Sequence, residues 1–191
     1  LIFTQLSFID FEAIVPSFHE SGSIPLGEAA EKFFEKHKPE DIEMGILVPN
    51  DIVTLFRKMA ASERFKDLRL AKYISKIKYD SPQQFAALTI MLPDGNHYIA
   101  FRGTDDTIIG WKEDFNMGFM TSVPSQLDAV KYVTAVSKEL EGGIILGGHS
   151  KGGNLAVYSA VHCPDEVKDR LVKVYNNDGP GFSKKIIDTE E

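Results

Sequence analysis

The pattern of hydrophobic and polar residues changes from a helical period to a strand period near residue 72. Over residues 6–18 the apolar side chains recur roughly at helical spacing, at Leu6, Ile9, Ala13 and Phe18. Residues 26–37 have the pattern of a short amphipathic helix that Pro39 ends. Residues 51–62 form another, which begins after Asn50, a residue type that caps helices. The first 70 residues are therefore predicted to be a helical region of the domain.

Strands and helices alternate in the rest of the chain. Residues 72–80 alternate apolar and polar, which predicts a half-buried strand. Two apolar runs, 85–92 and 97–103, flank the turn sequence PDGN and predict a hairpin. From residue 124 the predicted order is helix, strand, helix and strand, over 125–140, 143–148, 152–162 and 171–177. That order implies parallel strands, so the predicted fold is a single α/β domain over 1–191 with a mixed, mostly parallel sheet flanked by helices.

Composition narrows the class of protein. The 191 residues are 43% hydrophobic and 26% charged, which is typical of a folded domain. The net charge of −7, with no long Lys or Arg run, argues against a nucleic-acid partner. The single cysteine, Cys163, and the lack of a signal peptide or an apolar stretch of membrane-spanning length favour a cytoplasmic location without a transmembrane segment. Because the chain begins without Met and mid-pattern, we interpret it as part of a longer protein.

Residues 148–152, Gly-His-Ser-Lys-Gly, match the G-x-S-x-G pattern of a nucleophile elbow, a sharp turn between a strand and a helix. The predicted strand before it and the predicted helix after it supply that context. In such a turn the residue two positions before the serine lies against the residue two positions after it, so both must be very small. Gly148 and Gly152 meet this requirement. Ser150 is the candidate nucleophile, and the alternative is an ordinary serine in a glycine-rich turn. The order of residues does not match a phosphate-binding loop.

Two separated blocks resemble class 3 lipases. GGHSKGGNLAVYSA resembles their GHSxGGxLA elbow, and YIAFRGTDDTIIGWKEDF resembles their block of strand, RGT, loop and W-x-x-D. Together with VYNNDGPGF, these blocks make the chain most similar to a bacterial family of lipase-like α/β-hydrolases related to class 3 lipases. The resemblance covers about residues 70–183 and implies an α/β-hydrolase-like fold with further strands beyond residue 191.

The resemblance also implies two oxyanion-hole donors. Thr104, after Arg-Gly, supplies one backbone N–H, and Lys151, after the serine, supplies the other. The alternative for Thr104 is a simple turn residue. Class 3 lipases usually have an apolar residue where this chain has Lys151, so the cation either attracts an anionic group of the substrate or is a solvated side chain whose backbone alone matters. Asp114, with Trp111 beneath it, either braces the oxyanion loop or serves as a capping or solvated residue.

A serine nucleophile needs a histidine base and an acid, which follow the serine in α/β-hydrolases. His162 is the one histidine after Ser150, and we expect it about 15 Å or more away along the helix. His149 is expected to be packed or hydrogen-bonded rather than to act as a base. The remaining histidines, His19, His37 and His97, match no expected position. We therefore expect the catalytic histidine beyond residue 191.

Asp178 follows the last predicted strand and is the candidate acid. Two alternatives stay open: a later aspartate is the acid, or DGPG is a structural turn in which Asp178 holds backbone N–H groups. Asp105 and Asp106 precede the serine and are expected to face solvent, and no metal-ligand spacing is visible. The proposed chemistry needs no cofactor.

These residues predict a serine hydrolase that cleaves a small-molecule ester or lipid-like substrate through an acyl-enzyme on Ser150. The helical first third would shape or cover the acyl pocket. The alternative function is a non-catalytic binding module of the same fold without a complete triad. A peptidase or thioesterase is a third possibility, because the turn indicates an acyl-transfer nucleophile and not its leaving group.

Overall fold

The structure is a computed structural model that describes residues 1–37, 51–78, 83–104 and 122–182. In chain order its elements are α1 (Ile2–Leu6), β1 (Ile24–Pro25), α2 (Leu26–Lys36), α3 (Asp51–Ala60), β2 (Arg69–Lys78), β3 (Gln83–Met91), β4 (His97–Phe101), α5 (Pro124–Glu139), β5 (Ile144–His149), α6 (Lys151–His162), α7 (Asp165–Lys168) and β6 (Leu171–Asn177). The predicted helices at 26–37, 51–62, 125–140 and 152–162 are confirmed, as are the hairpin and the later strands. The predictions for Pro39, Asn50, Asp105, Asp106, Trp111 and Asp114 lie outside the described residues.

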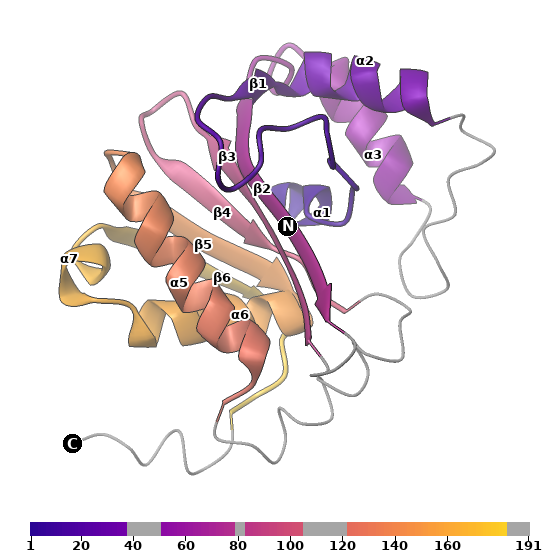
Figure 1. Cartoon of the computed structure of the whole chain (residues 1–191). Coiled ribbons are helices and arrows are strands. Elements are labelled where there is room, and N and C mark those ends of the chain that lie inside the picture. The colour runs from indigo at the N-terminus through magenta and orange to yellow at the C-terminus, as the bar shows by residue number, and fades with distance from the viewer. Residues whose placement is uncertain (38–50, 79–82, 105–121, 183–191) are drawn as a thin grey trace.

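The strands form one six-stranded sheet in the order β1-β2-β3-β4-β5-β6 (Figure 1). β1 to β4 pair antiparallel, and β4, β5 and β6 pair parallel. The prediction of a mostly parallel sheet is therefore wrong for the described residues. The connections over 79–82 and 92–96 are too short for the crossover of a dozen or so residues that a parallel pair needs. The predicted parallel arrangement applies only to the half of the sheet from β4 onward.

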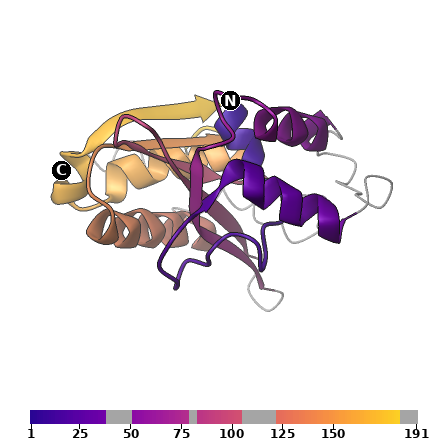
Figure 2. The ribbon, with the colours of Figure 1, turned by 90° about the horizontal axis from the view of Figure 1, so that it is seen from above.

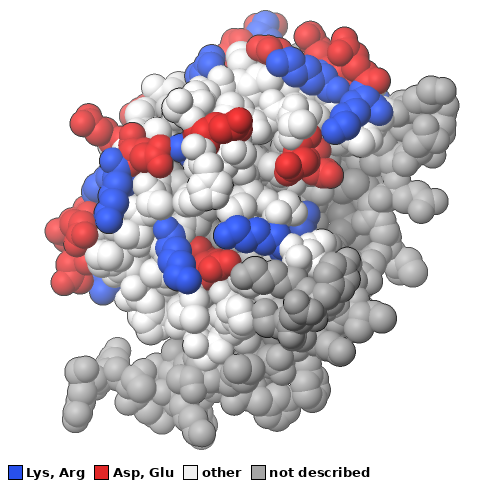
Figure 3. Space-filling view, viewed as in Figure 1, with Lys and Arg blue, Asp and Glu red and all other residues white. Residues whose placement is uncertain are grey.

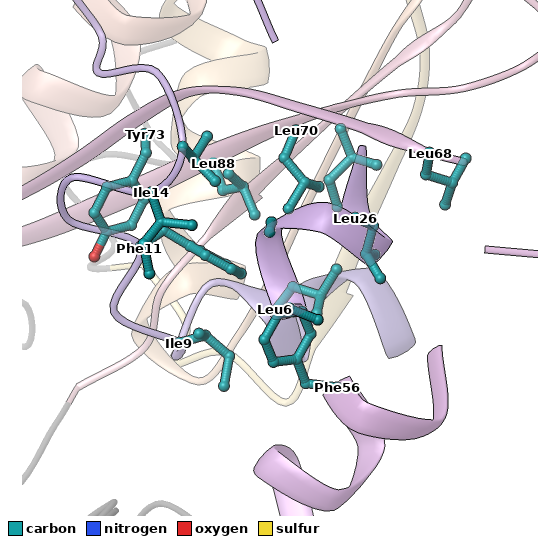
Figure 4. Close-up of a cluster of buried hydrophobic side chains, with 14 of the residues drawn as sticks. Leu6, Ile9, Phe11, Ile14, Leu26, Phe56, Leu68, Leu70, Tyr73 and Leu88 are labelled. Atoms are coloured by element: carbon teal, nitrogen blue, oxygen red, sulfur yellow. The ribbon is translucent and has the colours of Figure 1, made fainter. Parts of the chain in front are cut away.

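Helices cover both faces of this sheet, with α1, α2 and α3 on one side and α5, α6 and α7 on the other (Figures 1 and 2). Side chains of β4 alternate between the two cores: Tyr98 and Ala100 belong to the first, Ile99 and Phe101 to the second. Figure 4 shows part of the first core, in which the N-terminal segment, α2 and α3 pack against strand residues such as Leu70 and Leu88.

The helix predicted over 6–18 is wrong, because α1 ends at Leu6. The Ser7 hydroxyl donates a hydrogen bond back to the Thr4 carbonyl, and Ala13 has a φ of +59°, which a right-handed helix does not allow. Ile9 and Phe11 are nevertheless fully buried. The apolar spacing therefore marks an irregular segment that fills the first core rather than a helix. The first third also contributes strand β1, which the pattern did not predict.

The described surface mixes charges of both signs. On the face in Figure 3, Lys and Arg side chains are interspersed with Asp and Glu, and no continuous basic patch is visible there. Among the described residues, no helix has the length and apolar character needed to cross a bilayer. No group of three or more His, Cys, Asp or Glu side chains in these same segments is arranged to hold a metal ion.

Candidate functional site

Ser150 lies at the junction of β5, which ends at His149, and α6, which begins at Lys151. Its backbone has φ +53° and ψ −127°, a combination that residues with a Cβ rarely adopt. Hydrogen bonds hold this geometry: the Ser150 N–H donates to the Asn177 carbonyl (3.0 Å), and the Ser150 carbonyl accepts from the Gly153 N–H (2.8 Å). The side chain is partly exposed, and no hydrogen bond to its hydroxyl is found within the described segments.

Glycines allow three backbone segments to meet at this turn. A Cβ on Gly148 would overlap the backbone of Gly152, and a Cβ on Gly152 would overlap the Phe101 carbonyl at the end of β4. A Cβ on Gly153 would overlap the Asn176 side chain of β6. The ends of β4 and β5 and the first turn of α6 are thus in direct contact, which gives the physical reason for the glycine spacing around Ser150.

The Arg-Gly-Thr segment after β4 lies beside Ser150. A Cβ built on Gly103 would lie 2.7 Å from the His149 carbonyl oxygen and 3.6 Å from the Ser150 Cβ. Thr104, the next residue, is partly buried. The Phe8 ring lies 3.2 Å from the same Gly103 position, so the N-terminal segment borders the site. The structure therefore brings together two sequence blocks about fifty positions apart.

The Lys151 side chain is buried, with 1% of its surface exposed, and its Nζ donates to the Gln84 carbonyl (2.9 Å). The interpretation of Lys151 as a solvated side chain is therefore wrong. This bond reaches from the first turn of α6 to β3. Lys151 is also the first residue of α6, and N–H groups at this position have no acceptor inside a helix.

Asp178 follows β6 at the same edge of the sheet, is exposed and has φ +57°. The neighbouring turn is held by other side chains: Asn176 Oδ1 accepts from the Gly179 N–H (2.8 Å), and Asn177 Nδ2 donates to the Gly148 carbonyl (2.9 Å). No hydrogen bond to the Asp178 carboxylate is found in the described part of the chain. The backbone-holding role that the sequence allowed for Asp178 is thus filled by Asn176.

A chain of buried amides, which the sequence analysis missed, supports this arrangement. Gln126 Oε1 accepts from the Val123 N–H (2.9 Å), and Gln126 Nε2 donates to Asn154 Oδ1 (2.8 Å). Asn154 Nδ2 in turn donates to the Pro180 carbonyl (2.9 Å). The start of α5, the first turn of α6 and the loop after β6 are therefore linked. Asn154 could have been found from the sequence, because it is the polar residue within the otherwise small and apolar sequence GGNLA.

The five histidines of the chain are all described, and four of them are placed away from Ser150. His97 begins β4 at the opposite end of the strand, where its Nε2 contacts the Glu141 carbonyl (2.5 Å). His162 is exposed at the far end of α6 and packs on Tyr158. The other two lie in the N-terminal third, where His37 packs on Phe33 and His19 on Phe18. Only His149 adjoins the serine.

A surface hollow of about 590 Å³ lies elsewhere, lined by residues 13–16 and 19–21 of the N-terminal segment. It contains none of the residues that meet at Ser150. We therefore base the candidate site on the contacts around Ser150 and not on this hollow.

Comparison with protein families finds a match to the family described as Mbeg1-like, over residues 59–191. The matched region contains β2 to β6, the Arg-Gly-Thr segment and Ser150. Comparison with curated proteins and with solved structures finds no match. The chain therefore belongs to the Mbeg1-like family.

Proposed function

We propose that the protein is a lipase-like serine hydrolase of the α/β-hydrolase fold, which cleaves carboxylic esters through an acyl-enzyme on Ser150. The observation that carries the proposal is the strained backbone of Ser150 between β5 and α6, at a partly exposed residue whose hydroxyl makes no hydrogen bond within the described residues. Such strain persists only where surrounding structure imposes it, and it is concentrated at functional sites. Membership of the Mbeg1-like family supports the same reading.

In the proposed reaction, the Ser150 oxygen attacks the ester carbonyl carbon while a base takes its proton. The tetrahedral oxyanion accepts hydrogen bonds from the backbone N–H groups of Lys151 and Thr104. The base then returns the proton to the alcohol, which leaves, and a water molecule repeats the sequence to release the acid. Loss of one oxyanion donor typically lowers turnover by about 10²–10³-fold.

The proposal assigns Asp178 as the acid of the triad and a histidine beyond residue 191 as the base. Two observations support the assignment of Asp178. It is exposed after β6, and Asn176 rather than Asp178 accepts the hydrogen bond that holds the turn. Phe8, whose ring lies against Gly103 beside Ser150, offers an apolar wall for an acyl chain. This wall favours an ester or lipid-like substrate over a polar one.

A second candidate function is a binding module of the same fold that lacks catalysis. The observation that favours it is that four of the five histidines lie away from the serine, while His149 is the residue that directly precedes it. Without a base, the hydroxyl of a serine is a weak nucleophile. The residues around Ser150 would then bind the acyl group without cleaving the ester.

Labelling of the natural protein with a fluorophosphonate probe tests the proposal. We expect the wild type and Ser137→Ala, which alters a serine on α5, to be labelled equally, and Ser150→Ala to be unlabelled. Equal labelling of Ser150→Ala and the wild type would exclude Ser150 as the nucleophile. A folded wild type that reacts with no probe, yet binds an ester analogue, would support the binding module.

A further inference from the structure

The side chain of Lys151 is not explained by the chemistry proposed for its backbone. Its ammonium is buried one residue after Ser150, with 1% of the residue exposed. An ammonium that loses its water must be compensated by acceptors placed around it. One such acceptor is the Gln84 carbonyl of β3, 2.9 Å from Nζ. The cation therefore links the start of α6 to β3, which is separated in the sheet by β4 from β5, the strand that leads into α6.

The pairing of β3 and β4 places that acceptor near the end of β4. Ala87 pairs with Phe101, the last residue of β4, and the Arg102 N–H donates to the Ala86 carbonyl (3.0 Å). Gln84 lies two residues before Ala86 on β3, at the end of the sheet where the Arg-Gly-Thr segment follows β4. Lys151 thus bonds to β3 close to the point where β4 leads into Thr104, the second candidate oxyanion donor.

We infer that the Lys151 ammonium is a positioning group for the oxyanion hole of the proposed hydrolase. It fixes the first turn of α6, which follows Ser150 and carries one donor, to β3, the neighbour of the strand that leads into Thr104, the other donor. The Lys151 backbone would touch the substrate, whereas its side chain acts through the spacing of the two N–H groups. This inference rests on the proposed function for its catalytic consequence, but the link itself does not.

The spacing of the donors determines which kinetic constant changes. An oxyanion hole acts when its donors lie about 2.7–3.1 Å from the position that the oxyanion reaches in the transition state. A misplacement of about 1 Å can lower turnover about 10²-fold. Ground-state binding depends much less on this spacing. Loss of the ammonium should therefore lower kcat and leave KM nearly unchanged.

Lys151→Met, which keeps the length of the side chain and removes the ammonium, tests the inference in the natural protein. We expect kcat for a p-nitrophenyl ester to fall about 10–100-fold with KM changed less than about twofold. We also expect faster amide hydrogen exchange in peptides that contain Thr104 and Ser150, without a change elsewhere. Lys151→Arg, which retains a donor, should restore part of kcat. Lys131→Met, which alters an exposed lysine of α5, should match the wild type.

The two measurements separate this inference from the proposed function. If amide hydrogen exchange at Thr104 and Ser150 is as slow in Lys151→Met as in the wild type, the inference is wrong, whatever the activity of the variant. A loss of kcat that only follows the folded fraction would also overturn it, because the side chain would then be merely structural. If the wild type cleaves no ester and takes no probe, the proposed function fails, and local exchange in Lys151→Met then decides whether the link holds the two segments together.

Discussion

Lys72 and Ser150 both have a Cβ and a positive φ, and the two positions are stabilised differently. Lys72, in a bulge of β2, has φ +57°, and Ser150 has φ +53°. Lys72 is 4% exposed, its Nζ donates to the Glu20 carbonyl (2.9 Å), and it pairs with Glu139. The Ser150 hydroxyl makes no hydrogen bond in the described part of the chain, and the backbone of its neighbours holds the conformation.

The difference separates strain that the residue's own side chain supports from strain that only the surrounding backbone supports. At Lys72 the strained residue is stabilised by its own side chain, which joins the N-terminal segment to α5, and the Tyr132 hydroxyl donates to its carbonyl (2.8 Å). At Ser150 the hydroxyl makes no hydrogen bond among the residues that the structure describes. A strained residue whose side chain is unused is the stronger candidate for a functional role.

The largest expected effect comes from crowding the Ser150 turn. Gly148→Ala places a methyl group against the backbone of Gly152, which lies in the first turn of α6 and is itself packed closely against the Phe101 carbonyl at the end of β4. We expect a loss of about 4 kcal/mol in the free energy of unfolding. Urea unfolding measures it, with Gly181→Ala as the control because no atom lies within 4 Å of that position. A loss below about 1 kcal/mol would show that the backbone contact is not required.

Lys72→Gly removes the strain of the bulge together with the side chain that compensates for it. Because the buried stem and both of its polar contacts are lost, we expect a net loss of about 3 kcal/mol despite the relaxed backbone. Fluorophosphonate labelling per folded molecule should not change. Lys173→Gly, on the exposed strand β6, is the control and should cost less. A gain in stability for Lys72→Gly would contradict this prediction, because the Lys72 side chain would then not stabilise its strained backbone.

Alkaline pH should weaken the region around Lys72. Burial raises the pKa of Tyr73, which follows Lys72 in the first core, to about 12. Between pH 10 and 12 the hydroxyl ionises in the unfolded chain but stays protonated in the folded one, so stability falls as pH rises. The loss from this group should reach about 2 kcal/mol by pH 12. Urea unfolding of Tyr73→Phe over this range should show a shallower decline, and an equal decline would contradict the assignment.

Tyr132→Phe removes the hydrogen bond to the Lys72 carbonyl and leaves the bulge otherwise intact. The Tyr132 hydroxyl, which also bonds to Thr89 (2.8 Å), is fully buried in the second core. We expect a loss of about 1.5 kcal/mol, measured by urea unfolding. Probe labelling at Ser150 should be unaffected. A variant that keeps its stability but loses labelling would show that the two strained positions are coupled.

The smallest effect should be a gain. Ser150→Gly relieves the strain at φ +53°, so we expect a stabilisation of about 1 kcal/mol together with complete loss of probe labelling. Ser150→Ala, which retains a Cβ, should lose labelling without that gain. A destabilised Ser150→Gly would mean that the serine side chain supports the fold, as the lysine does at position 72.

Local patterns predicted most elements of this fold. The amphipathic patterns of α2 and α3, the alternation in β2 and the apolar runs of β3 and β4 appear in the structure close to their predicted bounds. The prediction of a helix over 6–18 was wrong because the spacing of apolar residues indicates which side chains are buried, and an irregular segment can bury the same side chains. The prediction of a mostly parallel sheet was wrong because the parallel order inferred after residue 124 was applied to the whole sheet. β2, β3 and β4 are joined by connections too short for a crossover, so they pair antiparallel.

The sequence by itself determined the Ser150 turn, because its glycines and the flanking strand and helix follow from local steric rules. Only the tertiary structure decided where the Lys151 ammonium lies and which side chain holds the turn after β6. The Lys151 ammonium donates to a carbonyl of β3, a strand distant in sequence, and Asn176 rather than Asp178 accepts from the Gly179 N–H. No local pattern encodes which distant backbone group a side chain will meet, since that is set by how the strands are ordered and paired.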